Sequence, residues 1–140
     1  MAIPNIVNVA NIYGHTAYVV PATAGTNNTN WQYHGPTGSN IAAITGLTPA
    51  TNAVNRVTSI SVSNFTGSAA TATVQIGNNA TFSSANLVAN LAFQIAVPAQ
   101  ATLVVVDKTA SFYLNEYQSL SVSAGTVNAL TFVAVFETIS

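Results

Sequence analysis

The chain has 140 residues, of which only two are Lys or Arg and three are Asp or Glu, so that 4% are charged and the net charge is −1. Soluble domains average about 25% charged residues, and a 14.4 kDa monomer is expected to expose roughly 6,800 Å². So few charges predict that much of this surface is buried against other subunits, or that Asn, Thr and Ser keep an ordinary monomer soluble. Two cations are too few for a phosphate backbone, which argues against nucleic-acid binding. Cysteine is absent, which excludes disulfides and thiolate chemistry.

One domain spanning residues 1–140 is the expected organisation for this length. No apolar run approaches the ~18 residues needed to span a bilayer, so we expect no membrane partner. The first residues, MAIPNIVN, have neither a basic region nor a long apolar stretch, and we therefore expect no cleaved leader.

The N-terminal part of the chain has an irregular pattern. Residues 1–12 alternate imperfectly and contain Pro4, which is typical of an edge strand or of an extended arm lying on a neighbour. We expect Tyr13-Gly14-His15 to interrupt this segment and residues 17–20 to form a short strand. Residues 21–55 are rich in Gly, Pro, Thr and Asn, and are predicted to be a long loop insertion on the surface, with short strands near 31–33 and 41–47.

The rest of the chain alternates with a period of two, which is typical of half-buried strands. Strands are expected at 56–63, 71–76 and 129–138. The stretch from Asn90 to Ala124 is predicted to contribute three more, joined by short connections and paired antiparallel, around which the other elements pack. Within it, Leu91, Phe93, Ile95 and Val97 are expected on one face. About eight strands and no useful 3.6-residue period predict an all-β fold, an antiparallel and jelly-roll-like β-sandwich.

Nothing in the sequence points to catalysis, and we expect neither a cofactor nor a metal. Glu116 and Asp107 are the only carboxylates close in sequence, and both are expected at solvated strand ends rather than as a glycosidase pair. His15 and His34 have no neighbouring Cys or His with metal-ligand spacing. No G-x-S-x-G elbow or phosphate-binding glycine loop is present. The chain is therefore predicted not to be an enzyme.

The best candidate for ligand binding is the aromatic set Trp31, Tyr33 and His34. Trp and Tyr two residues apart share one face of a strand, where sugar rings or protein partners stack. The alternative is that Trp31 packs into the core or into a subunit contact.

Three segments resemble small virion structural proteins of marine tailed phages: MAIPNIVNVANIYGHTA, IAVPAQATLVVVDKTASFYLNEYQSLSVSAG and FVAVFETIS. The similar motifs cover both ends and the central third of the chain, and they exclude residues 21–55. Two adjacent positions depart from the pattern: Gly-Asp follows the glutamate in the family, whereas Tyr117-Gln118 follow Glu116 here. The residues carrying the resemblance are Ile3 to Val9, Val97 to Leu103, Tyr113 to Leu120 and Glu137 to Ser140.

The resemblance implies a non-enzymatic virion component, most directly a capsid decoration (cement) protein that binds the shell as an oligomer. The implied partners are further copies of the chain, with a trimer favoured, and a major capsid or other virion protein. A neck, tail or fibre component belongs to the same class. The predicted bridging arm comprises Ile3, Pro4, Ile6, Val7 and Val9, because extended arms add to sheet edges. The alternative from another class is a carbohydrate-binding module that uses Trp31 and Tyr33 to hold a glycan.

Overall fold

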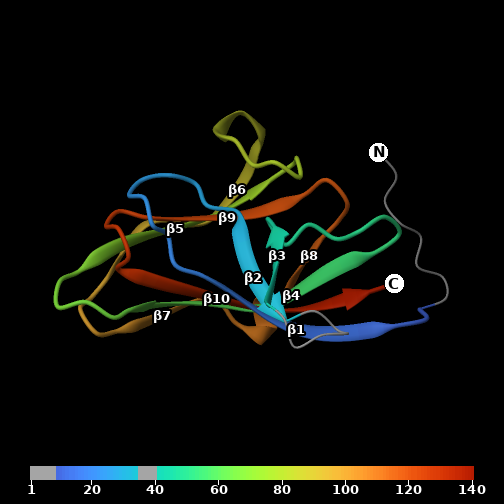
Figure 1. The fold of residues 1–140 in the computed structure, drawn as a ribbon, viewed down its shortest axis with the longest axis horizontal. Helices are drawn as coiled ribbons and strands as arrows, with labels where there is room; N and C mark the ends of the chain where they lie inside the picture. Colours follow the sequence, from blue (N-terminus) through green and yellow to red (C-terminus); the bar gives the residue numbers. More distant parts are fainter. Residues whose placement is uncertain (1–8, 35–40) are drawn as a thin grey trace.

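The structure, a computed structural model, describes residues 9–34 and 41–140. Within these ranges two antiparallel sheets pack face to face, which confirms the predicted all-β sandwich (Figure 1). The larger sheet has the order β3 (Ile41–Thr45), β2 (Asn30–His34), β1 (Ile12–Val19), β10 (Leu130–Ile139), β4 (Val54–Asn64) and β7 (Thr102–Val106), with β8 (Phe112–Leu114) also paired to β4. The smaller sheet has the order β6 (Leu87–Val97), β5 (Ala70–Gly77) and β9 (Ser119–Ala124). The described residues thus form ten strands rather than about eight.

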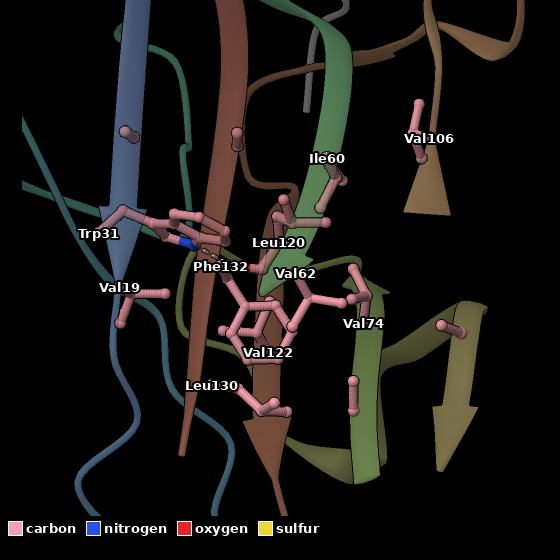
Figure 2. Close-up of a cluster of buried hydrophobic side chains, with 14 of the residues drawn as sticks. Val19, Trp31, Ile60, Val62, Val74, Val106, Leu120, Val122, Leu130 and Phe132 are labelled. Carbon is pink, nitrogen blue, oxygen red and sulfur yellow. Dashed lines mark hydrogen bonds between the residues drawn. The ribbon is translucent and has the colours of Figure 1, made fainter. Parts of the chain in front are cut away.

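Alternating residues from the two sheets form one core. On the larger sheet, Phe132 lies opposite Val62 in the register of β10 and β4, and both side chains are fully buried. On the smaller sheet, Val74 pairs with Val122, and these side chains face the first pair (Figure 2). Burying a side chain of this size stabilises the fold by about 1.5–3 kcal/mol, so the interior between the sheets is the main source of stability.

The stretch from Asn90 to Ala124 is organised differently from the prediction. Its strands do not pair with one another: β6 and β9 both pair with β5, whereas β7 and β8 both pair with β4. The chain therefore crosses between the sheets after β4, β6, β8 and β9 (Figure 1). Period-two alternation identifies strands but carries no information about which strand lies beside which, and this explains the error.

Strand β6 also departs from the predicted alternation. Its pairing with β5 contains three register shifts, and Gln94 has a φ of 50°. Ala92 and Val97 are buried, whereas Phe93 remains 56% exposed. A β-bulge adds a residue to one strand and reverses the side-chain parity beyond it. The expected single apolar face of Leu91, Phe93, Ile95 and Val97 is therefore not formed.

Residues 21–55 contain more structure than a surface loop. Both short strands predicted there are present, as β2 and β3, and they extend the larger sheet beyond β1. Leu47 and Trp31 from this segment are fully buried. Gly46 has a φ of 61°, and a Cβ on it would lie 2.5 Å from the Ser119 Cβ, so only glycine fits where the segment crosses β9.

Strand β1 is continuous from Ile12 to Val19, so Tyr13-Gly14-His15 does not interrupt it as predicted. It pairs with β10 along its whole length. The pairing continues beyond the strand, because the N–H groups of Ala10 and Asn11 donate to the Ser140 carbonyl at 2.8 and 3.0 Å.

Asn64, at the end of β4, has a buried side chain that supports the crossing to the smaller sheet. Its Nδ2 donates to the carbonyls of Ser68 and Val97 at 2.8 and 3.0 Å. Its Oδ1 accepts from the backbone N–H and the hydroxyl of Thr66 at 2.9 and 2.8 Å. A buried amide with all these partners is stabilising, whereas an unpaired one is costly.

Candidate functional site

Trp31 does not form a surface platform. Its side chain is fully buried on β2, and its indole Nε1–H donates to the Leu120 carbonyl of β9 at 3.1 Å. Figure 2 shows the indole pointing into the cluster beside Phe132 and Leu120. The prediction of Trp31 as an exposed stacking residue is therefore wrong, and the alternative of a core tryptophan describes its position.

Tyr33 shares the inner face of β2 with Trp31 and is half-buried. Its ring lies 5.2 Å from the His15 ring in an edge-to-face arrangement and 6.2 Å from the Phe136 ring. His15 also lies 5.0 Å from Phe136, so these rings form a packed aromatic cluster. His15 was not predicted to belong to this cluster, although its spacing of two from Ala17 and Val19 placed it on the buried face. His34 ends β2 opposite Ile41, and its side chain lies outside the described part.

Most of the predicted N-terminal arm lies outside the described residues, namely Ile3, Pro4, Ile6 and Val7. Val9, its last member, is described and is 49% exposed. The arm therefore stays a prediction, and the structure supplies its attachment point, the Asn11–Ser140 pairing described above.

The carboxylates have separate local contacts. Asp107 begins the short 3₁₀ turn η2 (Lys108–Ala110), and its Oδ1 accepts from the hydroxyl and N–H of Thr109 at 2.6 and 3.0 Å. These bonds hold the pKa of Asp107 below its ordinary 3.8 because they favour the charged form, and the bond from the Thr109 hydroxyl has the largest effect. Glu116 Oε1 accepts from the Asn52 N–H at 2.6 Å, and Glu137 lies 3.7 Å from Arg56. Each carboxylate thus has a structural contact, and none pairs with another.

Across residues 9–34 and 41–140, no three His, Cys, Asp or Glu side chains lie close enough together to hold a metal ion. The same part of the chain has no helix of the length and apolarity needed to cross a bilayer.

The outward face of the larger sheet is a second candidate, which was not predicted from the sequence. In the strand register Tyr18 lies opposite Val133, Val133 opposite Ser61, and Ser61 opposite Val104. Val135, on the same face, is 37% exposed, and Val104 is 61% exposed. We call this set, Tyr18, Ser61, Val104, Val133 and Val135, the outer-sheet patch.

The outer-sheet patch is apolar or hydroxyl-bearing across four strands. Arg56 and Glu137 lie on the same face toward one end of β4 and β10, where they pair with each other. An exposed apolar surface on a regular sheet is typical of a protein contact. The alternation of core-facing and outward-facing side chains along these strands could be predicted from the sequence. The order of the strands in the sheet, which brings the patch residues together, could not.

Comparison of the chain with protein-family models, with curated proteins and with solved structures finds no match.

Proposed function

We propose that this protein is a non-enzymatic structural component of a tailed-phage virion, and that it acts as a capsid decoration (cement) protein bound to the shell as an oligomer. The outer-sheet patch is the observation that carries the proposal. It offers exposed valines on a rigid sheet, in a chain with only five charged side chains. Packing the patch against a second copy removes apolar area from water, and the patch itself contains no charged side chain.

The resemblance to phage virion proteins gives independent support at one position. Tyr117 stands where the family pattern has glycine, and its φ is 66°. This left-handed conformation is one that glycine adopts without the steric cost that a Cβ imposes. The turn between β8 and β9 therefore has the geometry that the family's glycine would favour, even though the residue differs.

The N-terminal arm completes the proposed mechanism. Residues 1–9 precede a point at which the backbone is fixed to the C-terminal residue through Asn11 and Ser140. An arm that starts from such a fixed point reaches a neighbouring subunit in a defined direction. Added strands gain main-chain hydrogen bonds at a sheet edge, which suits a protein that cements a lattice.

The experiment that tests the proposal has two readouts on the full chain. Light scattering over a range of concentrations measures the mass in solution, and we expect a trimer. Immunogold labelling of particles of a phage that carries this sequence then places the protein, with label over the head expected. Label at the neck, tail or fibres keeps the virion role and overturns the decoration role. A monomer at every concentration, absent from purified particles, overturns both.

A further inference from the structure

The outer face of the smaller sheet carries a cleft of about 250 Å³. Its floor is formed by Thr71, Thr73 and Gln75 of β5 and by Ser123 of β9, whose side chains point away from the core-facing Ala72, Val74 and Val122. Phe93 and Gln94 of β6 border one side. The loop at Gly25 to Asn27 borders the other side, so the cleft lies over a rigid sheet rather than within a loop.

The loop wall is held in place by backbone hydrogen bonds to β9. The Gly25 N–H donates to the Ala124 carbonyl at 2.8 Å, and Asn28 and Val122 exchange bonds at 2.7 and 3.0 Å. These contacts also cover the outer edge of β9. A rigid floor and a fixed wall are what a preorganised binding site requires.

The bulge in β6 positions Phe93 at the side of the cleft. In the pairing of β5 with β6, Ala72 lies opposite Ile95 and Val74 opposite Ala92, so one β5 residue faces two residues of β6, Phe93 and Gln94. Thr73 Oγ1 accepts from the Gln94 N–H at 3.0 Å and holds this bulge. Phe93 therefore leaves the core and remains 56% exposed beside the polar floor. A bulge with a non-glycine residue at φ 50° has a steric cost, and such strained bulges occur next to binding sites.

The chemistry of the lining is neutral and polar. The five charged side chains of the protein, at positions 56, 107, 108, 116 and 137, are not part of it. Within the described chain, the side chains of Gln94, Ser123 and Asn27 take part in no hydrogen bond with the protein. Hydroxyl and amide groups both donate and accept, and so match a ligand that carries several hydroxyl groups.

We propose that this cleft binds an uncharged glycan, with one sugar ring against Phe93 and its hydroxyl groups bonded to Gln94, Ser123 and Thr71. The volume lies just below the range of about 300–1,000 Å³ typical of drug-sized ligands, which suits a single ring. A charged ligand would find no countercharge here. An extended peptide would need a free sheet edge, whereas this cleft lies on a sheet face.

The test begins with the purified full-length protein on an array of neutral and acidic oligosaccharides, followed by calorimetric titration with the strongest neutral ligand. We expect binding to neutral glycans alone. Phe93→Ala is expected to weaken it about tenfold, because the ring loses its stacking surface. Gln94→Gly keeps the backbone conformation, since glycine accepts a positive φ, and removes the amide. It is expected to weaken binding several-fold.

Phe65→Ala is the matched control, because Phe65 is 57% exposed and is not part of the cleft lining. This variant should bind as the wild type does, and thermal unfolding should show all three variants folded. Binding of acidic glycans only, or equal binding by all variants, overturns the proposal. An array on which no neutral oligosaccharide binds also overturns the proposal. This holds even if Phe93→Ala is then found to disrupt the oligomer, which would place Phe93 in a subunit contact. The virion role is tested separately by immunolabelling, so either proposal can fail alone.

Discussion

The indole Nε1–H of Trp31 donates to the carbonyl oxygen of Leu120 at 3.1 Å, and this bond joins β2 of the larger sheet to β9 of the smaller one. Gly46 makes a second connection nearby. Its carbonyl accepts from the Leu120 N–H at 2.7 Å, and its N–H donates to the Thr29 carbonyl at 2.6 Å. The segment predicted as an insertion is therefore part of the framework that holds the sheets together.

Trp31→Ala is expected to lower the free energy of unfolding by about 3–5 kcal/mol, because it leaves a large cavity at a fully buried position. Trp31→Phe keeps most of the apolar volume but leaves the Leu120 carbonyl unpaired, and a loss of about 1–3 kcal/mol is expected. Denaturant unfolding measures both. If Trp31→Ala unfolds like the wild type, the side chain is not buried in solution.

Val104→Lys is expected to shift the oligomer toward the monomer, since it places a charge within the outer-sheet patch, on its edge strand β7. The melting temperature of the isolated subunit should change little, because Val104 is 61% exposed. Val127→Lys is the matched control, at 50% exposure in the turn before β10. Light scattering of both variants at equal concentration measures their masses. Equal masses would show that the patch is not part of the subunit contact.

Tyr117→Gly is expected to stabilise the protein by up to about 1 kcal/mol, because glycine relieves the positive φ of the β8–β9 turn. Tyr113→Gly is the comparison, with an equally exposed tyrosine in the extended conformation of β8. It should lose roughly 0.5–1 kcal/mol through greater backbone entropy in the unfolded chain. Chemical denaturation of both variants measures the difference, and the same sign for both would contradict the assigned turn geometry.

The pH dependence of stability should include a contribution from Asp107. Its pKa is lowered in the folded state, chiefly by the Thr109 hydroxyl, so its stabilising contribution is present above the ordinary value of 3.8 and is lost as the pH falls through the folded value. Asp107→Ala should remove this part of the acid transition. Unfolding curves recorded on both sides of pH 3.8 compare the two proteins. An unchanged acid transition would show that the hydrogen bonds between Thr109 and the Asp107 carboxylate do not form.

Deletion of residues 1–9 is expected to weaken assembly while leaving the sandwich folded. The remaining chain keeps the hydrogen bonds of Ala10 and Asn11 to Ser140 and all of β1. Circular dichroism and light scattering of the truncated protein separate the two effects. An unfolded product would place the segment in the core, and an intact oligomer would argue against a bridging arm.

The sandwich class and most strand positions were predictable because side-chain alternation is a local property. Strand β10 illustrates this, since Leu130, Phe132 and Phe136 fall on one parity of the strand predicted at 129–138 and all three are buried. The aromatic pair Trp31 and Tyr33 was also correctly placed on one strand face. The sequence could not show that this face is the inner one, because that depends on β2 joining β1 at the side of the larger sheet.

By itself, the sequence determined the all-β class, the scarcity of charge and the positions of most strands, since these follow from composition and from a period of two. Only the tertiary structure decided which strands share a sheet, that Trp31 is buried against Leu120, and that Phe93 faces outward. Each of these depends on hydrogen bonds between residues far apart in the chain. The bulge at Phe93 and Gln94 exists only in the register with β5, and a shift of one residue in that register reverses the face on which every following side chain lies.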